Sequence, residues 1–162
     1  MQVIYSPWRL KYILSAKEKD CIFCVKPAEK KDKEHFIVAR SQMSFVILNL
    51  FPYNNGHIMV VPNKHIASLT DLSPEELTDL FSLVRDSEII LRKVYNPEGI
   101  NIGMNLGKAA GAGIDEHLHV HLVPRWSGDV NFMTSINAVR VIPESFESAY
   151  EKLSVEYRNL GY

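Results

Sequence analysis

Residues 115–126 read DEHLHVHLVPRW and place His117, His119 and His121 at two-residue intervals in an otherwise apolar run. In a β-strand, alternate side chains lie on the same face of the sheet. The three histidines are therefore expected on one face, and the apolar residues between them in the core. An amphipathic strand with an ordinary polar face would carry Lys, Thr or Glu at these positions, so the pattern indicates a functional site.

The chemistry of imidazole suggests what such a site could do. Imidazole can act near neutral pH as nucleophile, proton carrier, hydrogen-bond donor or metal ligand. A neutral imidazole can attack phosphorus without prior deprotonation, and a second acceptor can displace the resulting phosphorus–nitrogen bond. The preceding loop contains Gly107, Gly111 and Gly113, which would let backbone N–H groups approach an anion. Alternatively, this loop is simply a flexible connector.

The rest of the chain predicts an α+β fold with a mainly antiparallel sheet. Ser73, followed by Pro74 and Glu76, carries the sequence of a capping box, so we expect a long helix from there to about Tyr95. A C-terminal helix is expected over about 143–157, and the charged stretch 26–34 is expected to be a solvated loop. Alternating apolar patterns predict strands at 35–40, 43–50, 56–62, 99–105 and 117–124.

Composition restricts the classes of protein to consider. The chain has 162 residues, 46% of them hydrophobic, which fits a single domain over 1–162. A net charge of -1 shows no broad basic surface, so a nucleic-acid partner is not expected. No apolar run has the length of a membrane span, and the first residues do not resemble a signal peptide. We therefore expect a cytoplasmic protein.

The HLHVHLV run resembles the H-φ-H-φ-H-φ-φ signature of the histidine triad (HIT) family of nucleotidyl transferases and hydrolases, where φ is a hydrophobic residue. The similarity extends to ILNLFPYNNGHIMVVPNKHI, to SPEELTDLF, and to CIFC, which is similar to the N-terminal element of zinc-bearing members. The runs YSPWRLKYI, NLGKAAGAG and HLHVHLVPRWSGDVNF most resemble the family's bacterial dinucleoside polyphosphate phosphorylase branch, usually described as diadenosine tetraphosphate phosphorylases.

The resemblance implies a role for each histidine of the site. His119, the middle member, would be the nucleophile that forms a nucleotidyl-histidine intermediate, and His121 and His57 would contact phosphate oxygens. The remaining contacts that the resemblance implies are with the ribose, from Asn49, and with the reacting phosphate, from Asn105 and the backbone of Gly111, Ala112 and Gly113. The side chains of Asn49 and His57 could instead satisfy backbone groups near a turn.

A metal site is also expected. Cys21 and Cys24, together with His65 and His117, would form a Cys2His2 set suited to tetrahedral zinc. With all four positions filled by protein, the zinc would be structural and would fix the strand that carries the nucleophile. The alternative is a pair of buried reduced cysteines and a surface His65.

The implied activity is cleavage of dinucleoside polyphosphates, such as diadenosine tetraphosphate, with inorganic phosphate accepting the nucleotidyl group. Hydrolase members carry Gln, and phosphorylases a small hydroxyl residue, at the position of Gly113, so water remains an alternative acceptor. Nucleoside phosphoramidates are alternative substrates, and a non-catalytic nucleotide-binding module is a further alternative. The resemblance also implies a homodimer through the long helix and an adjoining strand, and allows a divalent cation to accompany the substrate.

Overall fold

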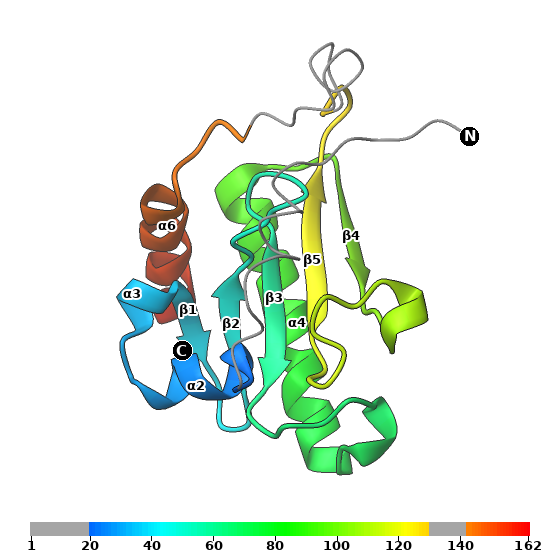
Figure 1. Ribbon diagram of the computed structural model, residues 1–162. Helices are drawn as coiled ribbons and strands as arrows, with labels where there is room; N and C mark the ends of the chain where they lie inside the picture. Colours follow the sequence, from blue (N-terminus) through cyan, green and yellow to red (C-terminus); the bar gives the residue numbers. More distant parts are fainter. Residues whose placement is uncertain (1–19, 130–141) are drawn as a thin grey trace, which may run out of the picture.

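The computed structural model describes residues 20–129 and 142–162, and a five-stranded antiparallel sheet forms its frame (Figure 1). The strands lie in the order β1-β2-β3-β5-β4, and every neighbouring pair is antiparallel. The expected α+β class with an antiparallel sheet is thus confirmed. The strand bounds are β1 Ile37–Arg40, β2 Ser44–Leu48, β3 Ile58–Pro62, β4 Gly99–Gly103 and β5 Val120–Arg125.

Two helices cover one face of this sheet. The long helix α4 (Pro74–Tyr95) begins at the expected capping box, in which Ser73 and Glu76 each bond the other's backbone N–H. The C-terminal helix α6 (Phe146–Asn159) begins about three residues later than expected, because the side chain of Ser145 caps it. Both pack on the larger apolar cluster, whose strand members include Val46, Leu48, Ile58, Val60, Val120 and Leu122.

The opposite face is covered by the short helix α2 (Ile22–Ala28), which lies in front of the strands in Figure 1 while α4 lies behind them. Phe23 of α2 is buried in the smaller apolar cluster. The residues that alternate with those of the larger cluster supply the rest of it, namely Ile37, Phe45, Ile47, Met59 and Val61. Alternation along β2 and β3 therefore separates the two cores.

The stretch 26–34 is not the loop expected from its charge. It contains the end of α2 and most of α3 (Asp32–His35). Arg40 of β1 explains the difference, because its guanidinium donates to the Pro27 carbonyl and to both carboxylate oxygens of Asp32. The charged residues are thus anchored to the sheet.

The strand expected from residue 117 begins only at Val120. The register with β3 would next pair Leu118 with Pro62, which has no N–H to donate. The N–H of Leu118 instead donates to the carbonyl of Ile66, and so His117 and His119 lie just before the strand rather than within it.

The part of the chain that the structure describes also contains two 3-10 helices, η1 (Leu69–Asp71) and η2 (Lys108–Ala110). Within 20–129 and 142–162, none of the helices combines the length and the apolar character that crossing a membrane would require.

Candidate active site

The histidines of the motif lie on the α2 face of the sheet. Leu118, Val120 and Leu122 belong to the larger cluster under α4, so the alternation predicted from the sequence is confirmed. The histidine face is not an exposed polar face, since His117 and His119 are only 1% and 6% exposed. The ring of Phe23 lies 5.5 Å from that of His117 and 5.2 Å from that of His119.

The backbone fixes the tautomer of His119. Its Nδ1 lies 2.8 Å from the carbonyl oxygen of His117. A carbonyl can only accept, so Nδ1 carries the proton and Nε2 of the neutral ring keeps a free lone pair. Burial lowers the pKa of His119, which favours the neutral form. This arrangement leaves Nε2 as the ring atom that is able to act as a nucleophile.

His57 and His121 form a second fixed pair beside it. His57 ends the turn between β2 and β3, and its Nε2 lies 2.9 Å from Nδ1 of His121. The N–H of Tyr53 donates to Nδ1 of His57 at 3.0 Å, so the proton of His57 resides on Nε2 and is donated to His121. Nδ1 of His121 therefore accepts, and the Nε2–H of His121 is the donor that can reach a phosphate oxygen.

The rings of His119 and His121 stand almost perpendicular, with centroids 4.8 Å apart. Burial, and then the charge of a protonated His119, lower the pKa of His121 to about 4. His119 and His121 thus lie side by side, and their lowered pKa values favour the uncharged form of both rings near neutral pH.

Asn49 contacts His57 through both its backbone and its side chain. Its backbone N–H donates to the carbonyl of His57, and its amide nitrogen lies 3.4 Å from Nδ1, the unprotonated nitrogen of the same ring. Its side-chain oxygen accepts from the N–H of Phe51. The side chain of Asn49 therefore satisfies a backbone group of the turn, as the alternative interpretation expected, and its contact with the ribose stays a prediction.

The glycine-rich loop follows β4, whose Gly103 pairs with His121. Asn105 begins this loop two residues later and is half-buried. Gly107 and Gly111 have φ values of +82° and +89°, which favour glycine. The N–H of Gly111 donates to the carbonyl of Lys108, which leaves the N–H groups of Ala112 and Gly113 as the candidate phosphate donors.

The four expected metal ligands come together although three segments supply them. Their ligand atoms all lie within 4.8 Å of one another. Nδ1 of His117 lies 3.2 Å from Nδ1 of His65, and 3.3 Å and 3.6 Å from the sulfurs of Cys21 and Cys24. Bonds of about 2.3 Å to sulfur and 2.0–2.1 Å to nitrogen would place the ligand atoms of a tetrahedral zinc roughly 3.3–3.8 Å apart. The donor set therefore fits zinc.

His117 links this cluster to the nucleophile. Its Nε2 lies 2.9 Å from the carbonyl oxygen of Pro62 and so carries the proton, which frees Nδ1 to bind a metal. Its own carbonyl accepts the Nδ1 proton of His119. A metal on the side chain of His117 would thus fix the group that orients His119.

Two contributors were not predicted from the sequence as parts of the site. Phe23 contacts the rings of His117 and His119, and the ring of Tyr53 lies 4.8 Å from that of His57. The position of Phe23 between the two cysteines is the only sequence signal for its place beside the histidines.

The comparison with protein families agrees with this geometry. The HIT domain family matches residues 30–128, more than half of the chain. This chain belongs to the HIT family. AP-4-A phosphorylase of Mycobacterium tuberculosis is 38% identical over 165 aligned residues, which cover 97% of this chain and 85% of that protein. The asymmetrical bis(5'-nucleosyl)-tetraphosphatase of Schizosaccharomyces pombe is 40% identical over 90 residues, covering 56% and 49%.

Solved structures of HIT proteins share the fold. A Zn-bound histidine triad family protein from Mycobacterium smegmatis superimposes with a TM-score of 0.70 at 27% identity, covering 87% of this chain and 95% of that one. A histidine triad nucleotide-binding protein from Sulfolobus tokodaii also gives 0.70, at 25% identity over 86% and 93% of the two chains.

Proposed function

We propose that this HIT protein cleaves dinucleoside polyphosphates, such as diadenosine tetraphosphate, and transfers the nucleotidyl group through His119 to inorganic phosphate. The observation that carries the proposal is the contact between Nδ1 of His119 and the carbonyl of His117, which directs the Nε2 lone pair outward as a nucleophile. The similarity to AP-4-A phosphorylase over most of both chains supports the choice of substrate and acceptor.

The reaction takes two displacements at the same phosphorus. First, Nε2 of His119 attacks the α-phosphorus, and the P–O bond to the leaving ATP breaks. The Nε2–H of His121 donates to a phosphate oxygen and offsets the charge that develops there. Second, an oxygen of inorganic phosphate attacks the adenylyl-histidine, the P–N bond breaks with its electron pair returning to Nε2, and ADP leaves.

Product analysis tests the acceptor. Purified protein is mixed with diadenosine tetraphosphate, with and without phosphate, and the nucleotides are separated. ADP and ATP, formed only with phosphate, would establish phosphorolysis. AMP and ATP, formed regardless of phosphate, would make water the acceptor.

Two observations favour the hydrolase alternative. Gly113 lacks the hydroxyl that the phosphorylases carry at this position, and a tetraphosphatase is among the relatives. An adenosine 5'-monophosphoramidase of Schizosaccharomyces pombe, 28% identical over 134 residues, keeps nucleoside phosphoramidates as a second substrate class. A purely nucleotide-binding role would not need a histidine whose Nε2 lone pair is held free by a fixed tautomer.

Zinc is our proposed structural metal at Cys21, Cys24, His65 and His117. Burial raises the pKa of the Cys24 thiol, and the charge of Cys21 raises it further. Two neighbouring thiolates therefore need a bound cation to coexist. The Zn-bound Mycobacterium smegmatis neighbour supports this assignment. A divalent cation that enters with the polyphosphate remains an expectation.

We further propose a homodimer formed through α4 and β4. Phe81 and Ile89 on α4 and Ile102 on β4 are 42–52% exposed. Among the described strands, β4 lies at the edge of the sheet and pairs only with β5. An unpaired strand edge and exposed apolar side chains are both features that a second copy of the chain could cover. A cytoplasmic location, with nucleotides rather than nucleic acid or membrane as partners, completes the proposal.

A further inference from the structure

A second polar network lies where the β2–β3 turn meets the end of β5. The turn supplies Asn54, which is 8% exposed, and the residues after β5 supply Asp129. One side-chain nitrogen of Asn54 donates to the carboxylate of Asp129 at 2.7 Å and to the carbonyl of Pro124 at 3.0 Å. Both partners can only accept, so the orientation of the amide is fixed.

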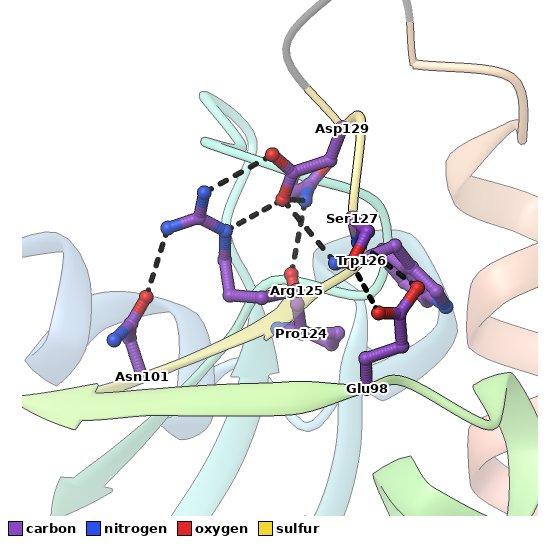
Figure 2. A network of polar contacts seen from close by, with 8 residues as sticks. Glu98, Asn101, Pro124, Arg125, Trp126, Ser127 and Asp129 are labelled. Atoms are coloured by element: carbon purple, nitrogen blue, oxygen red, sulfur yellow. Dashed lines mark hydrogen bonds and ion pairs between the residues drawn. The ribbon is translucent and has the colours of Figure 1, made fainter.

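The other side of the network holds Asp129 in place. Figure 2 shows the guanidinium of Arg125 facing the Asp129 carboxylate on one side and Asn101 of β4 on the other. Arg125 donates to both carboxylate oxygens, at 2.6 Å and 3.0 Å. Gly128, at a φ of +81°, permits the turn that returns Asp129 to Arg125. The carboxylate is therefore an ionised acceptor in a fixed position.

Backbone hydrogen bonds of the β2–β3 turn connect Asn54 to His57 and His121. The carbonyl of Asn54 accepts the N–H of His57 at 3.3 Å. The N–H of Tyr53, the preceding residue, donates to Nδ1 of His57, and Nε2 of His57 donates to His121. A displacement of Asn54 would therefore move the donor that sets the tautomer of His57.

We propose that Asn54 and Asp129 are positioning residues that latch the β2–β3 turn to the strand carrying the histidine motif and thereby fix the tautomers of His57 and His121. The latch joins the turn to β5 through Pro124 and Asp129, and to β4 through Arg125 and Asn101. Its effect on rate rests on the proposed function, whereas its effect on the tautomer does not.

Asn54→Asp is the sharpest variant, because it keeps the shape while replacing both donated hydrogens by a charge that faces Asp129 and the Pro124 carbonyl. Asn55→Asp is the matched control, since it places the same charge at the next position of the same turn. Asp129→Asn is the second variant, because a single amide oxygen cannot serve both Arg125 and Asn54. Circular dichroism and thermal melting establish that each variant is folded.

The first readout is NMR of protein labelled with 15N-histidine, without substrate. Wild type and Asn55→Asp should show His57 protonated at Nε2, whereas Asn54→Asp and Asp129→Asn should show a mixture of tautomers. The second readout is turnover of diadenosine tetraphosphate. The two latch variants should lose roughly tenfold to a hundredfold in kcat, with KM within about threefold of wild type, as expected for displaced catalytic groups.

Wild-type tautomers, or a wild-type kcat, in either folded latch variant would overturn the proposal. If the wild-type protein itself does not cleave the substrate, the proposed function fails, and the tautomer of His57 still decides whether the latch exists.

Discussion

The carbonyl oxygen of His117 accepts the Nδ1 proton of His119 at 2.8 Å, so one residue of the candidate metal site also orients the proposed nucleophile. The side chain of His117 faces the two cysteines and His65, while its backbone faces His119. The proposed metal site uses the side chain of His117, and the proposed nucleophile depends on its carbonyl. The two roles can therefore be tested with different variants.

His119→Gly should abolish turnover and leave nucleotide binding intact. The change removes Nε2, the atom that forms the covalent bond, so kcat should fall by at least about a thousandfold. Steady-state kinetics and calorimetric titration with a nucleotide measure the two effects. His35→Asn is the control, because His35 lies on α3 and pairs with Glu29 outside the site. Unchanged turnover in His119→Gly would refute the mechanism.

Zinc removal should destabilise the fold around His117. Cys24→Ser removes one ligand, and its metal content, measured by mass spectrometry, should drop below that of wild type. Zinc bound only by the folded state stabilises it by about 4 kcal/mol when free zinc is a thousand times the Kd. Chelation should therefore lower the melting temperature of wild type but not of Cys24→Ser. Equal metal content in the two proteins would contradict the assignment.

Stability should fall as the pH falls from about 6.5 to about 4. Burial holds the pKa of His121 at about 4 in the folded state, against 6.5 for an ordinary histidine. The unfolded state therefore takes up the proton first, and the free energy of unfolding decreases across this window. One histidine contributes at most about 1.4 kcal/mol per pH unit.

Urea unfolding at several pH values checks this sign. His121→Asn cannot take up the proton, so its unfolding free energy should change less steeply with pH than that of wild type. Identical slopes in the two proteins would show that His121 titrates normally in the folded state.

The sequence predicted the parts of the fold that depend on local pattern. Alternation placed Leu118 and Val120 in one core, and the capping box placed the start of α4. It failed where distant contacts decide the local structure. Arg40 turns a charged stretch into short helices, and Pro62 delays the start of β5. Neither effect is visible in a window of neighbouring residues.

The same distinction holds for the site. The histidine spacing and the two cysteines carry strong chemical signals, and the structure brings the four expected ligands together. Asn54 looked like an ordinary turn residue, and nothing in the sequence around Asp129 indicated a partner in that turn. Their contact joins residues 75 positions apart and is known only from the fold.

Ile102→Glu should weaken the dimer. The new carboxylate would lie at the β4 edge, where we expect a second copy to pack. Burying this charge in the interface would cost free energy of dimerisation. Sedimentation equilibrium should show a shift towards monomer. Val155→Glu is the control, since Val155 is similarly exposed but lies on α6, which is not part of the proposed interface. A wild-type dimer constant in Ile102→Glu would argue against this interface.

The covalent intermediate tests the central claim most directly. Wild-type protein is mixed with diadenosine tetraphosphate in the absence of phosphate and quenched with base on the millisecond scale, and its peptides are mapped by mass spectrometry. We predict an adenylyl group on His119, which disappears with release of ADP when phosphate is added before the quench. Turnover with the adenylyl group on another residue, or with no adenylylated peptide at any time, would contradict the account.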